Sequence, residues 1–354
     1  MLTILSRRNI LKALGIAALG TTVFSGAVLA QETVTLSYAL WDQEQVPAMQ
    51  QAIDEFKETH PNIDIRIQVT PWDDYWTKLQ TSATGGSAPD VFWMTLAYFQ
   101  LYASNGILMP LDDKIAADGI DMANYVPAIA EAYKYDGVQY GMPKDVNAFG
   151  LFYNKDLFTA AGVPFPDETW TWDNVIDAAQ KLTDADAGVY GIAAQPGDEL
   201  AWYLTVPQAG GHVISEDGKS SGYDTPETQA GIQFWVDMIT KYNASPSLQQ
   251  MTDTDALSMF TSGKVAMMYG GSWDPVAIAQ VPAAKAFTDV APLPKGPAGG
   301  KFYSNGLANS IYANTQHPEE AWEFVKFLSS QRGNEIQAAS GTVISAYNGQ
   351  AGAY

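Results

Sequence analysis

The chain has 354 residues, of which 47% are hydrophobic, and a formal net charge of −20. The excess of acidic groups excludes the clustered basic surface that nucleic-acid binding needs, and it argues against adhesion to anionic lipid. The absence of cysteine excludes disulfides, thiolate metal ligands and a cysteine nucleophile, so stability must come from a large apolar core.

The first thirty residues have the pattern of a secretory signal. Arg7 and Arg8 precede an uncharged apolar stretch, residues 13–28, and small residues at Val28-Leu29-Ala30 suit a processing site. The paired arginines resemble the twin-arginine export signal. An uncleaved membrane anchor is the weaker interpretation, because the stretch is short and rich in Gly, Ala and Thr. We therefore expect export to the periplasm, with a mature chain of 324 residues and a charge of −23.

The first half of the mature chain alternates between strand and helix patterns. Apolar spacing predicts strands at residues 33–40, 63–69 and 90–94, and helices at 44–59 and 73–83. A turn at Tyr135-Asp136-Gly137 then leads into a further strand at 138–142.

The second half repeats this alternation. The sequence predicts strands at 148–153 and 188–193, a helix at 172–182 capped by Thr171, and a helix at 225–242 with Pro226 in its first turn. Repeated β-α-β units predict doubly wound α/β sheets. The mature length favours two α/β lobes over a single sheet.

A strand-to-helix turn near residue 270 is the most informative local feature. Residues 265–269 form a short apolar run typical of a buried strand, which Gly270 and Gly271 are expected to break. Ser272 then fits the N-cap of a helix that runs from Trp273 to about residue 280. Trp273 would lie at the carboxyl edge of a sheet, where open α/β sheets bind ligands. The alternative is that its ring only plugs the top of the domain.

Metal binding and catalysis have little support in the sequence. The histidines His60, His212 and His317 are far apart, so we expect neither a metal site nor a cofactor. A glycan hydrolase would need two carboxylates that face one cleft. Acids follow or end several predicted strands, but no catalytic signature joins them. We therefore expect no enzyme, and a secreted glycan hydrolase stays the alternative from another class. These acids are Asp42, Asp90, Asp145 and Asp274.

Aromatic residues give the positive signal for a ligand. The chain has 10 Trp and 18 Tyr. Sugars stack their C–H faces on such rings, while their hydroxyls bond to nearby carboxylates and amides. Predicted strand ends carry Trp41, Trp93, Trp202, Trp273 and Tyr303, with Asp42, Asp274 and Asn305 as polar neighbours. The other tryptophans fall on predicted helices or their caps, and we expect most of them to pack: Trp72, Trp76, Trp170, Trp172, Trp235 and Trp322.

The scarcity of arginine narrows the ligand class. Only Arg66 and Arg332 follow the signal, and guanidinium groups are the usual clamps for carboxylate and phosphate. A neutral polyol or oligosaccharide therefore fits best. Lys144 is a cation next to Asp145, so an anionic ligand is not excluded. A polyol, a glycerol phosphate and a polyamine remain the alternatives within binding proteins.

Short motifs in a shared order resemble those of one family. They are Pro89-Asp-Val-Phe-Trp93, Tyr140-Gly-Met-Pro-Lys-Asp145, Tyr153-Asn-Lys-Asp156, Gln208-Ala-Gly-Gly211 and Ala321-Trp-Glu-Phe-Val-Lys-Phe-Leu328. With these motifs the chain resembles the family 1 extracellular solute-binding proteins over nearly all of its mature length. The family comprises the sugar-capturing subunits of ATP-driven importers, such as the maltose- and lactose-binding proteins.

The resemblance implies the fold of the type II periplasmic binding proteins, two α/β lobes that grip the ligand between them. Chain crossings are then expected near residues 144–148, 287–290 and 331–342. The first lobe would comprise 31–144 and 290–332, which folds Tyr303 back towards Trp41. The second lobe would comprise 145–289 and 333–354. Members of the family continue beyond the region that matches residues 341–346, so further second-lobe helices are expected after Tyr354.

The resemblance also implies the residues of the site. Trp93 and Trp273 match stacking aromatics of the family, and Asp145 and Asn147 fall on the hinge, where sugar hydroxyls are bonded. The remaining expected ligand contacts are Trp41, Asp42, Trp202, Gly271, Ser272, Asp274, Tyr303 and Asn305. The implied partners are a small carbohydrate and the membrane permease of an ABC importer. We expect a monomer, with no stable membrane insertion after cleavage.

Overall fold

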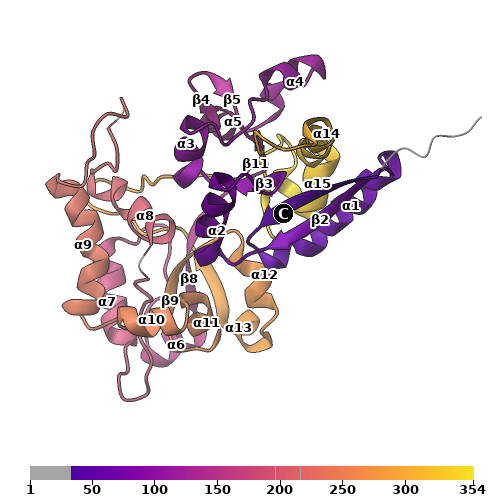
Figure 1. Ribbon diagram of the computed structural model, residues 1–354. Helices are drawn as coiled ribbons and strands as arrows, with labels where there is room; N and C mark the ends of the chain where they lie inside the picture. Colours follow the sequence, from indigo (N-terminus) through magenta and orange to yellow (C-terminus); the bar gives the residue numbers. More distant parts are fainter. Residues whose placement is uncertain (1–32, 196, 216) are drawn as a thin grey trace, which may run out of the picture. The chain divides into compact units, whose positions relative to one another are not determined.

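Figure 1 shows the computed structural model of the protein, which describes residues 33–195, 197–215 and 217–354. The predicted export signal, residues 1–30, lies outside the described residues. None of the described helices is long and apolar enough to cross a membrane.

A five-stranded sheet organises what we call the first lobe. Its strand order is β2 (Ile63–Val69), β1 (Val34–Leu40), β3 (Val91–Met94), β11 (Ala308–Ile311) and β6 (Met142–Pro143). The first three strands are parallel, whereas β11 runs antiparallel to both of its neighbours. The bounds of β2 are those that its alternating sequence predicts.

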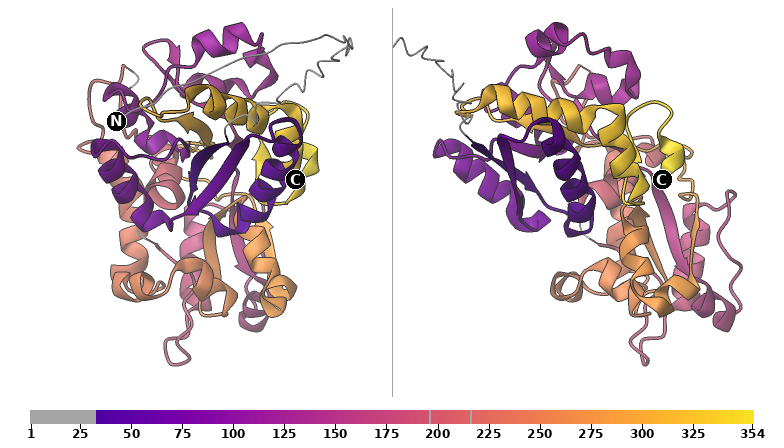
Figure 2. Two further views of the ribbon diagram at one scale, coloured as in Figure 1. Left: turned by 45° about the vertical axis from the view of Figure 1, so that its right-hand side comes forward. Right: turned by 90° about the vertical axis from the view of Figure 1, so that its right-hand side faces the viewer.

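Alternate side chains of these strands face two helical layers. Tyr38 points into the core formed with α1 (Val46–Thr59), α14 (Pro318–Ser329) and α15 (Gln331–Ala339). Ala39, the next residue, packs on the other face with α2 (Trp72–Thr84), α3 (Leu96–Ser104) and α5 (Pro127–Ala132). Figure 2 shows the late helices α14 and α15, in yellow, beside the indigo β1 and α1. The chain therefore returns to its first strands after a long excursion.

A three-stranded antiparallel sheet organises the second lobe. Its order is β10 (Thr288–Ala291), β8 (Phe149–Asn154) and β9 (Met267–Gly271). One face packs on α6 (Lys155–Ala161), α7 (Trp172–Leu182), α8 (Tyr203–Thr205) and α9 (Pro226–Thr240). The other face packs on α10 (Leu248–Asp253), α11 (Ala256–Thr261), α12 (Asp274–Ala279) and α13 (Pro282–Phe287). The predicted strand at 188–193 forms only isolated bridges, two of which join it to Val265 and Met268.

Short elements complete the described fold. They are α4 (Asp112–Ala117), the hairpin strands β4 (Lys134–Tyr135) and β5 (Val138–Gln139), β7 (Asp145–Val146) and β12 (Ile344–Ser345). The predicted turn between β4 and β5 is confirmed, since Asp136 and Gly137 both have positive φ.

The crossing segments between the lobes meet around residues 144–147. The backbone N–H of Lys144 donates to the Leu307 carbonyl at 2.8 Å, and Asn147 does the same with Asn305 at 2.8 Å. The same crossing segment also pairs, through β7, with the antiparallel strand β12. Gly306 is required here, because a Cβ at this position would lie 1.9 Å from the carbonyl oxygen of Asp145.

The return crossing differs from the expected one near residues 287–290. β10 (Thr288–Ala291) pairs with β8 along its whole length, so this segment is part of the second sheet. The chain then continues along the second lobe, where Lys295 bonds to Trp170 and Tyr303 to Tyr203. The crossing was expected from the family resemblance alone, whereas here these residues form an edge strand of the second sheet.

The turn after β9 also differs from the prediction. Gly270 and Gly271 do not break the strand, since both pair with β8. Ser272 does not cap the helix, because α12 begins at Asp274 with Trp273 at its N-cap position. Ser272 is instead held by its backbone, whose N–H donates to the Ala148 carbonyl at 2.9 Å.

Candidate ligand-binding site

A cavity of about 510 Å³ lies between the ends of the two sheets. The first lobe contributes Trp41, Asp42, Gln43, Gln45, Trp72, Asp73 and Thr95. The crossing segments contribute Asp145, Asn147, Leu307, Thr342 and Val343. The second lobe contributes Gln195, Gly197, Glu199, Leu200, Ser272 and Trp273. The volume is that of a small-molecule site.

Strand ends explain why these residues converge. β1 ends at Leu40 and is followed by Trp41 and Asp42, and β3 ends at Met94 and is followed by Thr95. In the second lobe β9 ends at Gly271 and is followed by Ser272 and Trp273. β1 and β3 are parallel, and the carboxyl ends of parallel strands are the usual place for ligands. Trp273 follows the carboxyl end of β9, as its sequence predicts, but the sheet there is antiparallel.

Trp41 is held rigidly by other aromatic rings. Its ring centroid lies 5.0 Å from that of Tyr75 and 5.2 Å from those of Trp72 and Trp93, in edge-to-face arrangements. Such pairs favour a fixed orientation. The ring can therefore meet a ligand at a small entropic cost.

Trp273 is positioned by a glycine. A Cβ on residue 271 would lie 2.3 Å from the Trp273 ring, so the ring rests directly on the backbone at Gly271. Phe149 contacts it edge to face at a centroid distance of 6.0 Å. The ring is half-buried and lines the cavity. It therefore offers the cavity apolar aromatic surface from the second lobe.

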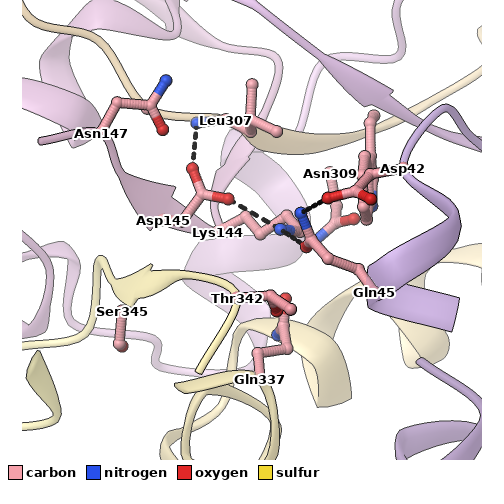
Figure 3. Close-up of polar contacts among 12 residues, drawn as sticks. Asp42, Gln45, Lys144, Asp145, Asn147, Leu307, Asn309, Gln337, Thr342 and Ser345 are labelled. Carbon is pink, nitrogen blue, oxygen red and sulfur yellow. Dashed lines mark hydrogen bonds and ion pairs between the residues drawn. The ribbon is translucent and has the colours of Figure 1, made fainter. Parts of the chain in front are cut away.

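A chain of polar contacts runs from Asp42 to the crossing segments (Figure 3). The Gln45 amide donates to Asp42 at 2.8 Å, and its oxygen accepts from Lys144 Nζ at 2.8 Å. Lys144 also donates to Asp145 Oδ2 at 2.7 Å, and Asp145 Oδ1 accepts from the Leu307 N–H at 2.7 Å. Both carboxylates are thus fixed acceptors with lone pairs to spare for ligand hydroxyls.

Asn147 connects the crossing segment with the second lobe. Its amide nitrogen donates to Glu199 Oε1 at 2.9 Å and also to the side-chain oxygen of Asn305. Asn147 and Glu199 line the cavity, whereas Asn305 lies behind Asn147 as its support.

Asp274 is buried and directly follows Trp273 after the end of β9. Its Oδ2 accepts the Gly271 N–H at 2.9 Å. Burial raises the pKa of Asp274 to about 7; the Gly271 bond opposes this rise, and the charges of Asp42, Asp255 and Glu199 add to it. Asp274 therefore stabilises the backbone at Gly271 through this hydrogen bond, and it is not among the residues that line the cavity.

The structure brings together six of the twelve predicted site residues in the cavity: Trp41, Asp42, Asp145, Asn147, Ser272 and Trp273. Trp93 is fully buried, and its indole N–H donates to the Tyr38 hydroxyl. Trp202 packs against the core of the second lobe, and Tyr303 contacts Tyr203 rather than lining the cavity with Trp41. Gly271 and Asn305 contact Trp273 and Asn147, which do line it, and Asp274 accepts the N–H of Gly271.

Several residues that line the cavity were not predicted from the sequence. Trp72 was expected to pack, but it is 38% exposed and faces the cavity from the first turn of α2. Its position just after β2, beyond Thr70 and Pro71, is a signal that could have identified it. Gln45 lies in a 3₁₀ turn at the start of the predicted helix, where nothing local singled it out, and Glu199 lies in a π-helical segment that the sequence did not predict.

Acidic and amide groups dominate the polar lining. Among the described residues that line the cavity, carboxylates come from Asp42, Asp73, Asp145 and Glu199, and none of these lining residues is a lysine, arginine or histidine. Arg332 is engaged by Glu55 through two bonds of 2.6 and 2.8 Å, and Arg66 is largely exposed. In the described part of the chain, no three or more His, Asp or Glu side chains are grouped so that they could hold a metal ion.

Comparison with known proteins gives consistent results. The family profile described as bacterial extracellular solute-binding protein matches residues 41–335. A maltotriose-binding protein of Pyrococcus abyssi is 27% identical over 81% of this chain and 60% of its own length. A mannitol-binding protein of Pseudomonas aeruginosa is 26% identical over 72% of this chain and 59% of its own length.

A solved structure supports the same relationship. The ABC substrate-binding protein of Listeria monocytogenes in complex with cycloalternan superposes with a TM-score of 0.82 at 28% identity, over 90% of this chain and 81% of that one. The chain therefore belongs to the bacterial extracellular solute-binding proteins.

Proposed function

We propose that this protein is a periplasmic receptor that captures a neutral mono- or oligosaccharide and delivers it to the membrane permease of an ABC importer. The observation that carries the proposal is a cavity with tryptophans from both lobes, Trp41 and Trp72 facing it from one and Trp273 from the other. Sugar rings stack on such surfaces while the fixed carboxylates of Asp42 and Asp145 accept their hydroxyl protons.

The lobe arrangement supports a closing mechanism. A ligand that touches both lobes stabilises the state in which both contact it, and this shifts the hinge equilibrium. The crossing segments at residues 144–147 and 304–307 would form the hinge. Two stacked faces and several hydrogen bonds suit an affinity near 1 μM, about −8 kcal/mol. We further propose a monomer, export by the twin-arginine route and no catalytic activity.

A polyamine is the second candidate ligand, and one observation favours it. Besides Asp145, which is paired with Lys144, the described lining includes the carboxylates of Asp42, Asp73 and Glu199 and no cationic side chain, which suits a ligand with ammonium groups. The relatives named for maltotriose and mannitol support an uncharged polyhydroxyl ligand instead.

Calorimetric titration tests the proposal. The purified protein would be titrated with neutral mono- and oligosaccharides, polyols, sugar phosphates and polyamines, after a thermal-shift screen of the same compounds. We expect saturable binding of at least one neutral sugar near the micromolar range. Binding of polyamines alone would favour the second candidate. Turnover of any oligosaccharide would show that the protein is a hydrolase.

A further inference from the structure

Lys144 occupies the point where the crossing segments meet. Its backbone N–H donates to Leu307 at 2.8 Å, and its carbonyl accepts from Ala346 at 3.3 Å. The segment after α15 and the segment before β11 are therefore both attached to this residue. The side chain is fully buried.

The ammonium group of Lys144 is completely engaged. It donates to Gln45 at 2.8 Å and to Asp145 at 2.7 Å, and it lies 4.2 Å from the centre of the Trp93 ring. A buried charge persists only when such partners compensate it. Figure 3 shows Lys144 between Gln45 and Asp145, which both line the cavity, whereas Lys144 itself does not.

This placement separates two roles of Asp145. Its carboxylate remains an acceptor for ligand hydroxyls, but its charge is neutralised from behind by Lys144. Without that ammonium, the Asp145 end of the cavity would hold an uncompensated buried carboxylate. In a partly desolvated site such a carboxylate attracts a cation far more strongly than it attracts a hydroxyl.

We propose that Lys144 is a specificity-determining residue that sets the charge preference of the site, so that the cavity accepts uncharged hydroxyl-rich ligands in preference to analogues bearing an ammonium group. The inference rests on the proposed function, since it assumes that a carbohydrate occupies this cavity. The alternative is that Lys144 serves only to hold the crossing segments together.

The test compares ligand pairs of nearly equal shape. The probes are the strongest neutral binder of the panel and its analogue with an ammonium in place of one hydroxyl, together with glucose and glucosamine, and cellotriose and the β-1,4-linked glucosamine trimer. Affinities would be measured by calorimetry in slightly acidic buffer, in which the amines are charged. In Lys144→Met, which keeps the length of the side chain, the affinity ratio should shift at least tenfold towards the charged analogue.

Two further variants make the result specific. Lys78→Met removes an exposed lysine of α2 that bonds to Thr70 outside the cavity, and it should leave the ratio unchanged. The double variant K144M/D145N removes both buried charges, so it should return the ratio towards that of the wild type. If Lys144→Met is too unstable to measure, Asp145→Asn tests the same charge balance, because it leaves the Lys144 ammonium uncompensated and should shift the ratio away from the charged analogue.

The outcomes distinguish the inference from the function on which it rests. If the wild type binds no carbohydrate, both fail. If the wild type binds a neutral sugar and Lys144→Met weakens the charged and uncharged members of each pair equally, the proposed function stands and the specificity role is refuted. A double variant that keeps the wild-type ratio alongside a shifted single variant supports the proposal.

Discussion

Trp273 differs from an aromatic side chain that only packs. The ring lies on the backbone at Gly271 and touches Phe149, yet it is only half-buried and lines the cavity. A plug for the domain would be enclosed, as Trp235 is at 5% exposure.

Truncation of Trp273 should therefore affect binding more than folding. We expect Trp273→Ala to lower sugar affinity tenfold or more, about 1.4 kcal/mol or above, because one stacking face is lost. Its free energy of unfolding should change much less than that of Trp235→Ala, a core truncation of the kind that costs about 3–5 kcal/mol. Calorimetry and urea unfolding measure the two effects. Equal destabilisation by both substitutions would favour the plug.

Asp274 makes a different prediction at the same scale, one that concerns pH. Its pKa of about 7 in the folded protein is above the ordinary value of 3.8, so the folded state retains a proton that the unfolded state has released. The stabilising contribution is complete below the ordinary value and is lost as pH rises through about 7. Asp274→Asn cannot titrate. Its stability relative to the wild type should increase by about 2–3 kcal/mol between about pH 5 and pH 8.

Urea unfolding at several pH values checks this prediction. Glu168→Gln, at an exposed loop position, is the matched control and should show no such trend. A constant difference between Asp274→Asn and the wild type across the range would mean that Asp274 stays ionised in the folded protein.

At the scale of secondary-structure elements, the end of β9 shows how backbone shape prepares the site. Two glycines end the strand without breaking its pairing to β8. The second of them lets the Trp273 ring lie against the main chain. The first leaves room for the carboxylate of Asp274 and the ring of Phe152, because a Cβ there would lie 2.6 Å and 2.7 Å from them.

A methyl group at residue 271 should therefore disturb the ring without removing it. Gly271→Ala would place a Cβ 2.3 Å from the Trp273 ring, so the ring must move. We expect tenfold or greater loss of sugar affinity, together with a change in tryptophan fluorescence. Gly352→Ala, where nothing lies within 4 Å, is the control. Unchanged affinity in Gly271→Ala would show that the orientation of the ring is unimportant.

Elements with strong periodicity were predictable, whereas those fixed by long-range pairing were not. β2 follows from its alternation alone, because residue period and burial agree along the whole strand. Gly270 and Gly271 suggested a strand end, but their conformation depends on the neighbouring β8, which no local pattern reveals. β10 likewise depends on its pairing with β8, which the family resemblance did not reveal.

The candidate site shows the same division. Trp41, Asp42 and Trp273 could be predicted because they follow strands directly. Trp93 could not be excluded, because whether an aromatic at a strand faces the core or the cavity depends on the pleat and on the helices that cover it. Trp93 is covered by the first-lobe core and by Lys144.

At the scale of the whole molecule, both lobes line the cavity that we propose as the ligand site. Trp41 and Asp42 follow a strand of one sheet and Trp273 follows a strand of the other, while Asp145 and Asn147 lie on the crossing segment. Outside the cavity, the Gln280 amide of the second lobe donates to the Glu44 carboxylate of the first, and within it Asn147 of the crossing segment contacts Glu199. A bound ligand would add to these links.

Ligand should therefore protect both lobes together. At a sugar concentration of about 100 times Kd, the free energy of unfolding should rise by about 2.7 kcal/mol, because only the folded state binds. Hydrogen exchange should slow at residues 41–45, 145–147 and 271–274 in the same titration. In Trp273→Ala, the same protection should need a tenfold higher sugar concentration, whereas Trp170→Ala should leave this concentration unchanged, because Trp170 is buried away from the cavity. Protection confined to one lobe would mean that the ligand does not bridge the two.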